Sequence, residues 1–378
     1  MARSIISLLL ALAVVTMAAN SAVARQFKKP AYYKLSNEPY GVVSTDFNND
    51  GNLDLAVAEF SGQVGILLGK GKGTFHPARY FSAPGAIALA YGDFNGDHNL
   101  DLAVIEYGGT GYSALGIFLG DGQGNFRSSA TYQLGVESTS VAVANFNGDG
   151  HLDIAATNEH GSGKNGKDGS VMVFFGNGDG TFKAPSLYKL PGQPYAVAVG
   201  DFKGNHHPDL AVAEDAGNSV AILMNNGSGK FRHTATYHTD IEAICVAIAD
   251  LDHNGVQDLV VGDAIGNVAV LLGSGDGTFG RATLYSTSPT GTTEAVVIAD
   301  FNLDGNPDIA VAVSGGQDGG VVLLYGNGDG TFQSLVHIGI SKGDGLSLAA
   351  GDFNKDGAPD LAVPIDGSEV MAILLNTQ

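Results

Sequence analysis

The chain has 378 residues and a formal net charge of −20, from 39 acidic and 19 basic side chains. This acidic balance argues against nucleic-acid binding, which requires a basic face. The lone cysteine, Cys245, excludes an intrachain disulfide, and its apolar surroundings indicate a small core side chain.

The N-terminus has the features of a secretory signal peptide, which we predict to span residues 1–24. Arg3 gives a positive start, residues 5–15 are almost wholly apolar, and Ala22-Val23-Ala24 has the small-x-small form of a cleavage site. The apolar run is too short to cross a bilayer, and a retained membrane anchor is the alternative. We therefore expect a secreted monomer with no membrane span and a single domain over residues 25–378.

From residue 46 onward, one acidic motif recurs seven times. Its clearest copy covers residues 300–308, where oxygen-bearing side chains stand at positions 1, 3, 5 and 9 of the motif. Successive copies start 47 to 56 residues apart, a period that indicates a repeat architecture. The copies begin at Asp46, Asp93, Asn145, Asp201, Asp250, Asp300 and Asp352.

Each repeat has the signals of four short strands. In the fourth repeat, apolar runs at 195–199, 210–213 and 220–223 are separated by the acidic motif and by a turn. A glycine-rich turn such as residues 176–182 then leads into the last strand of a repeat, and no stretch has a helical period. We predict an all-β, seven-bladed β-propeller with four antiparallel strands per blade.

The two ends of the chain complete one blade between them. Residues 27–35 match the segment after the glycine-rich turn in later repeats, such as residues 75–80, so the chain begins partway through a repeat. Residues 373–376 stop where other repeats continue into that turn. The last blade is therefore expected to be closed by the N-terminal strand.

The acidic motif has the donor pattern of a calcium loop. Calcium takes six to eight oxygen ligands, and glycine at position 6 allows the sharp turn that gathers them. An EF-hand is excluded because the copies have Val or Ala at position 12, where a bidentate Glu is required, and the flanks are strands. The plain alternative is an acidic turn that stays hydrated.

We predict about six Ca²⁺ ions, with side chains at positions 1, 3, 5 and 9 and the backbone carbonyl at position 7 as ligands. The six ligand sets are Asp46, Asn48, Asp50, Asn52 and Asp54; Asp93, Asn95, Asp97, Asn99 and Asp101; Asn145, Asn147, Asp149, His151 and Asp153; Asp250, Asp252, Asn254, Val256 and Asp258; Asp300, Asn302, Asp304, Asn306 and Asp308; and Asp352, Asn354, Asp356, Ala358 and Asp360.

The fourth loop is predicted to hold no metal. Lys203 stands at position 3, and its ammonium would compete with a cation by pairing with Asp201 and Asp209. In the second loop, His98 replaces the glycine of position 6 and predicts modest backbone strain. The residues at position 2, mostly Phe, are expected to be core wedges.

The motif D-F-N-x-D-G-x-x-D-L-A-V, followed by G-N-G-D-G-T-F, resembles the FG-GAP or VCBS-type repeat. It is also similar to the calcium-binding blades of integrin α subunits. The resemblance covers nearly the whole mature chain and implies a calcium-binding propeller. It does not imply one activity, because such propellers occur in adhesins, lectins and polysaccharide-active enzymes.

The resemblance also implies that ligands bind on the face opposite the metal loops. Acidic or polar residues stand there five positions after the last loop aspartate in five blades: Glu59, Glu106, Asn158, Glu214 and Asp263. They predict an incomplete acidic ring at the mouth of the funnel, the alternative being solvated strand ends. A long connection over 158–169, with Glu159 and His160, is a second candidate, either a binding loop or a mobile insertion.

Three classes of function remain open. The favoured one is a non-catalytic, calcium-stiffened scaffold for adhesion to a protein or glycan ligand. A lectin is the second, although the sequence has no Trp, the strongest platform for stacking on sugars. A lyase or hydrolase acting on polysaccharide is the third, and no catalytic motif stands out in the sequence.

Overall fold

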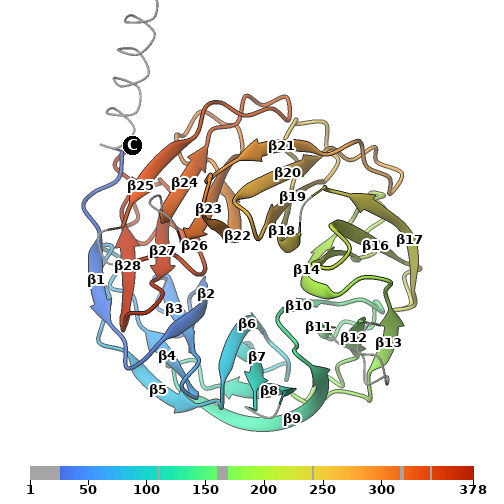
Figure 1. Ribbon diagram of the computed structural model, residues 1–378. Coiled ribbons are helices and arrows are strands. Elements are labelled where there is room, and N and C mark those ends of the chain that lie inside the picture. The colour runs from blue at the N-terminus through green and yellow to red at the C-terminus, as the bar shows by residue number, and fades with distance from the viewer. Residues whose placement is uncertain (1–25, 109–110, 160–168, 241, 316–318, 341–342) are drawn as a thin grey trace, which may run out of the picture.

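The computed structural model describes residues 26–108, 111–159, 169–240, 242–315, 319–340 and 343–378, which form 28 strands and no helix. The strands make seven antiparallel sheets of four, arranged around a central axis (Figure 1). This confirms the predicted seven-bladed propeller. The predicted signal peptide lies outside the described residues.

Within each of six blades the strands follow one another in sequence order from the axis outward. The strands of these blades are β2 (Pro39–Thr45), β3 (Asp54–Glu59), β4 (Gln63–Leu67) and β5 (Arg79–Ser82); β6 (Ala86–Gly92), β7 (Asp101–Tyr107), β8 (Tyr112–Gly120) and β9 (Phe126–Val136); β10 (Val141–Ala144), β11 (Asp153–Asn158), β12 (Ser170–Phe174) and β13 (Ser186–Lys189); β14 (Pro194–Gly200), β15 (Asp209–Glu214), β16 (Ser219–Asn225) and β17 (Phe231–His238); β18 (Ala243–Ala249), β19 (Asp258–Asp263), β20 (Asn267–Leu271) and β21 (Thr283–Ser286); and β22 (Thr292–Ala299), β23 (Asp308–Ser314), β24 (Gly320–Leu324) and β25 (Val336–Gly339).

The seventh blade joins the two ends of the chain. It consists of β26 (Ala349–Gly351), β27 (Asp360–Pro364), β28 (Val370–Leu374) and, outermost, β1 (Ala31–Lys34). In the antiparallel pair of β1 and β28, Ala31 lies opposite Ile373 and Lys34 opposite Val370. The predicted closure by the N-terminal strand is therefore confirmed.

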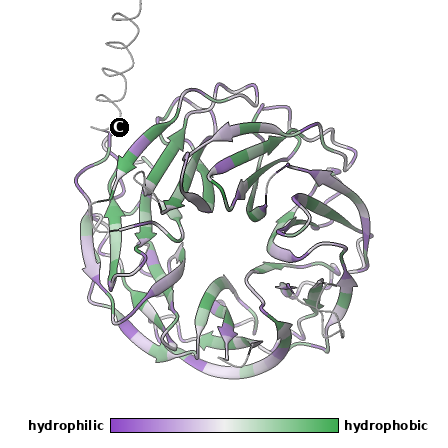
Figure 2. Cartoon of the chain, in the orientation of Figure 1, coloured by the Kyte–Doolittle hydropathy of each residue, from purple (hydrophilic) through white to green (hydrophobic). Residues whose placement is uncertain are grey.

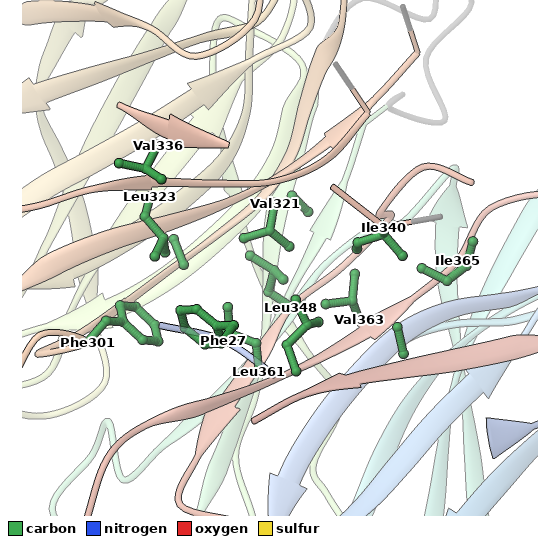
Figure 3. Packing of buried hydrophobic residues seen from close by; sticks show 14 of the residues in the cluster. Phe27, Phe301, Val321, Leu323, Val336, Ile340, Leu348, Leu361, Val363 and Ile365 are labelled. Carbon is green, nitrogen blue, oxygen red and sulfur yellow. The ribbon is translucent and has the colours of Figure 1, made fainter. Parts of the chain in front are cut away.

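The second and third strands of each blade form the core because both of their faces are covered by neighbouring blades. Their near-continuous apolar runs are mostly buried, and most of their residues are green in Figure 2. At the junction of the sixth and seventh blades, Phe301, Leu323 and Leu361 belong to one buried cluster with Phe27 from the N-terminus (Figure 3). Burying these faces against each other holds adjacent blades together.

The position 2 residues are wedges between blades, as predicted. All seven are almost fully buried: Phe47, Phe94, Phe146, Phe202, Leu251, Phe301 and Phe353. The ring of Phe353 meets that of Phe75 in the next blade edge to face at 5.5 Å, and its carbonyl accepts a 2.8 Å hydrogen bond from the Gly73 amide. Phe353 therefore ties the acidic loop of its blade to the glycine-rich turn of the next.

Candidate metal loops and the opposite face

Every acidic loop joins the first and second strands of its blade. The glycine-rich turn between the third and fourth strands lies beside it: the amide side chain of Asn52 packs so closely against Gly71 that any Cβ there would clash. The loops and turns therefore share one face of the propeller. Neighbouring loops also meet, because Nδ2 of Asn49 donates to Oδ1 of Asn99 at 3.2 Å.

All seven loops have the same backbone shape. Positions 4 and 6 both have positive φ, so two residues of each loop adopt the left-handed backbone conformation that favours glycine. Position 6 was expected from its glycines, and His98 adopts φ 65° there, as the predicted strain requires. Position 4 was not foreseen: Leu303, exposed and without any glycine-like freedom, adopts φ 60°. The loop conformation thus does not depend on the residue type at these positions.

The backbone of the sixth loop shows how this shape gathers oxygens. Oδ1 and Oδ2 of Asp300 accept hydrogen bonds from the amides of Asp304 (3.0 Å) and Gly305 (2.8 Å). Oδ1 of Asn302 accepts from Asp304 N at 2.9 Å, and Oδ1 of Asp304 from Asn306 N at 2.8 Å. The side chains of positions 1, 3 and 5 are therefore turned back over their own loop.

The position 9 aspartate has a second role that its sequence position does not reveal. In the sixth blade Oδ2 of Asp308 accepts from Phe301 N at 2.9 Å, and Oδ1 from Gly326 N, beyond the third strand, at 2.8 Å. The same pair of backbone bonds recurs at the other six position 9 aspartates, which are also fully buried: Asp54, Asp101, Asp153, Asp209, Asp258 and Asp360. These carboxylates hold each loop against the edge of its sheet.

Burial of this carboxylate has an electrostatic consequence. Desolvation raises the pKa of Asp308 to about 6, although the amides of Gly326 and Phe301 oppose the rise. In the last blade burial raises the pKa of Asp360 to about 7, with Asp356 and Asp352 adding repulsion. A cation among these carboxylates would favour their ionised forms.

The donor set of the loops fits a hard cation. In the fifth loop, carboxylate oxygens of Asp250, Asp252 and Asp258 lie within 4.8 Å of one another. Amide oxygens complete such sets in the other loops, for example Asn302 at position 3. Several oxygens converging on one point, with no sulfur or imidazole at positions 1, 3, 5 and 9, are the ligands that calcium prefers.

The fourth loop folds like the others, but its lysine does not act as predicted. The amides of Asn205 and His206 still donate to Asp201 at 3.0 and 2.6 Å. Among the ion pairs of the described residues, none joins Lys203 to Asp201 or Asp209, so the predicted direct pairing is not formed, although the charge of Lys203 opposes the rise that burial causes in the pKa of Asp209. The lysine stem instead lies against Gly277 in the turn of the next blade, a contact between blades that motif spacing alone cannot predict.

The predicted acidic ring on the opposite face is also wrong as an exposed feature. Its members, Glu59, Glu106, Asn158, Glu214 and Asp263, are all buried. They stand at the ends of second strands, and several accept hydrogen bonds from nearby connections. Oε1 of Glu214 accepts from Gly192 N at 3.0 Å, and Oδ1 of Asp263 accepts from the amide of Ile265 at 3.1 Å.

The real mouth of the funnel is lined by the starts of the seven inner strands. It is a cavity of about 260 Å³ whose walls include Tyr40, Tyr195 and Glu294. Burial raises the pKa of the Glu294 carboxyl, and the negative charges of Asp366 and Asp344 raise it further. A hydrogen bond from Ser314 partly opposes this rise. Glu294 was missed because nothing in its repeat pattern distinguishes it. Of the predicted connection, Glu159 is half-buried and His160 lies outside the described residues.

Seven blades, each with an oxygen-rich loop between its first two strands, define a β-propeller assembled from short acidic repeats. Matches to the FG-GAP-like repeat cover residues 46–104, 93–156, 161–212, 201–261, 250–311 and 304–363. The chain therefore belongs to the FG-GAP-like repeat family. In the part of the chain that the structure describes, no helix could cross a membrane.

Known proteins resemble the chain at two levels. Bovine (Bos taurus) phosphatidylinositol-glycan-specific phospholipase D is 39% identical over 80 residues, which is 18% of this chain and 10% of that protein. BBS1N, solved in complex with ARL6DN, has a TM-score of 0.63 at 15% identity, with 93% of this chain and 97% of that one covered. A lectin from Agrocybe aegerita that recognises non-reducing terminal N-acetylglucosamine has a TM-score of 0.56 at 21% identity. The match covers 90% of this chain and 86% of the lectin chain. The two structural similarities show the fold alone.

Proposed function

We propose that this protein is an exported, calcium-binding β-propeller that acts as a non-catalytic binding scaffold for a protein or glycan ligand. The observation that carries the proposal is the common shape of the seven loops, which turn side-chain oxygens inward on one face of a closed ring. Six loops would hold Ca²⁺ through the positions named above, and the fourth, with Lys203 at position 3, would not.

Charge supports the metal assignment. Aspartates at positions 1, 3, 5 and 9 make up about half of the 39 acidic residues, and the first two of the loops that carry them touch each other. Clustered carboxylates repel and destabilise a compact state, and bound dications would reverse that effect. With one cysteine the chain has no intrachain disulfide, so calcium would supply the stiffening that a secreted protein otherwise gains from such bonds.

The scaffold role is supported by the separation of the acidic loops and the cavities onto opposite faces of the propeller. The loops and turns lie on one face, while the funnel mouth of the other face offers cavities to a ligand. The phospholipase D shares only a tenth of its length with this chain, so its activity is not carried over. A lectin is the second candidate, supported by the aromatic side chains around the mouth and by the fold shared with the Agrocybe aegerita lectin.

Calcium titration of the purified protein tests the proposal. We expect about six ions bound, and each site to stabilise the fold by about 2.7 kcal/mol when free calcium is 100 times its Kd. Asp304→Ala should remove about one ion, whereas Asp201→Ala, in the fourth loop, should remove none. An unchanged melting temperature in chelator would contradict the metal assignment.

Export is tested separately, by sequencing the N-terminus of secreted protein, which should begin at Arg25.

A further inference from the structure

A second cavity opens beside the funnel mouth, on the face opposite the acidic loops. It has a volume of about 220 Å³ and is lined by residues of the first four blades. Tyr40 stands at the start of β2, Phe60 just after β3 and Tyr107 at the end of β7, in each case far along the strand from the acidic loop. We call the cavity formed by Tyr40, Phe60, Tyr107, Ser138 and Glu159 the aromatic pocket.

Three rings form a row along one side of the aromatic pocket. The centroids of Tyr40 and Phe60 are 6.3 Å apart, and those of Phe60 and Tyr107 are 6.2 Å apart with planes only 26° from parallel. Tyr40 and Phe60 are 44% and 43% exposed, although aromatic side chains are the most favourable to bury. An exposed row of aromatic rings beside a cavity is typical of a binding surface.

The aromatic pocket also has a polar group that lacks a partner. Ser138 is fully buried, and among the described residues its Oγ has no hydrogen-bond partner. Its backbone is fixed, because Ser138 N donates to Oγ of Ser113 at 3.0 Å and the preceding residue, Glu137, adopts φ 55°. Leaving a buried hydroxyl unpaired is costly, so a polar atom entering the cavity would gain a hydrogen bond already prepared for it.

The described side chains that line the aromatic pocket carry charge of one sign. Its walls include Glu137 and Glu159, and none of the described lining residues is Lys or Arg. Burial raises the pKa of the Tyr195 phenol, and the nearby carboxylates of Glu294 and Glu159 add to that effect. Carboxylates accept hydrogen bonds from hydroxyl groups but repel other acidic groups. An acidic ligand is therefore disfavoured.

We propose that the aromatic pocket binds a neutral oligosaccharide, an inference that rests on the scaffold function proposed above and names its ligand class. The apolar C–H face of a sugar ring lies flat on the row formed by Tyr40, Phe60 and Tyr107. Sugar hydroxyls donate to the carboxylates, and one of them pairs with Oγ of Ser138. A basic peptide would also suit the charge, and its cations could contact the aromatic rings. It would not, however, need rings arranged in a row or a hydrogen bond to the Ser138 hydroxyl.

Calorimetric titration of the calcium-loaded protein with four probes tests this inference. Chitohexaose and cellohexaose are neutral, hexagalacturonate is acidic and hexalysine is basic. We expect heat and a change in tyrosine emission, which is not masked because the chain has no Trp, with at least one neutral probe. Hexagalacturonate should not bind. Binding of hexalysine alone, or of no probe by a protein that still binds calcium, would overturn the inference while leaving the metal loops intact.

Three variants locate the site. Phe60→Ala should weaken binding of the neutral probe about tenfold. Tyr91→Ala is the matched control, because Tyr91 is 40% exposed but lies at the opposite end of its strand, beside the acidic loop. Ser138→Ala should weaken binding about three- to tenfold without lowering the melting temperature, since the lost hydroxyl had no partner. Equal losses in Phe60→Ala and Tyr91→Ala, or unchanged affinity in both Phe60→Ala and Ser138→Ala, would contradict the site.

Discussion

Replacing a position 9 aspartate should destabilise the protein even when calcium is absent. In Asp308→Ala, the amides of Phe301 and Gly326 lose the acceptors that now lie at 2.9 and 2.8 Å. Each buried amide without an acceptor costs about 1–3 kcal/mol. Relief from burying a carboxylate offsets part of this loss, so we expect the free energy of unfolding to fall by about 2–4 kcal/mol.

Asp304→Ala is the control in the same loop. Asp304 is exposed, and its Oδ1 accepts from the exposed amide of Asn306, which water can satisfy instead. We expect a loss below about 1 kcal/mol. Urea unfolding in chelator measures both variants, and the difference should appear in the midpoint at constant slope. Equal midpoints for the two variants would refute the structural role of Asp308. In calcium, both variants should lose the additional stabilisation of that loop.

Three further perturbations test other parts of the fold. Leu303→Gly should raise the free energy of unfolding by about 0.5–1 kcal/mol, because glycine adopts φ 60° without the strain that a Cβ causes there. Leu303→Ala keeps the Cβ and should give no such gain. Thermal melts compare the two variants. Burial raises the pKa of Glu106 to about 7, so ionising this carboxyl in the folded protein lowers the free energy of unfolding as pH rises from about 4.5 to 7. At pH 8 the free energy of unfolding of Glu106→Gln should exceed that of the wild type by about 1–2 kcal/mol, after allowance for solvent screening. At pH 4.5 the two proteins should be equally stable. Asn376→Ala removes an amide that donates to Phe301 O at 2.7 Å across the closing blade, and a loss of about 1–3 kcal/mol in urea is expected; an unchanged midpoint would show that this bond does not help to close the ring.

The fold was predictable because its signals repeat. The period of the acidic motif, the alternation of short apolar runs with turns, and the partial repeats at the two ends each point to the same closed ring. The position 2 wedges were predictable for the same reason, since a large apolar residue recurs at one place in every blade. Repetition therefore makes weak local signals reliable.

The features that could not be predicted from the sequence are mainly those that depend on contacts between blades or with neighbouring connections. Glu214 and Lys203 stand at regular positions of their repeats, but their surroundings come from the neighbouring connection or the next blade, which sequence spacing does not encode. The left-handed backbone of Leu303 was hidden because Leu gives no sign of such a conformation. Likewise, Phe60, Ser138 and Glu159 meet in one cavity only because three blades converge at the funnel mouth.

Closure of the ring determines where the molecule can begin to come apart. In a linear array an end repeat detaches by losing one interface, but each blade here has a neighbour on both sides. Outermost in the closing blade, β1 pairs with β28 alone. Peeling β1 away would separate the two ends of the chain and expose the backbone of β28, with which a strand of another chain could then pair.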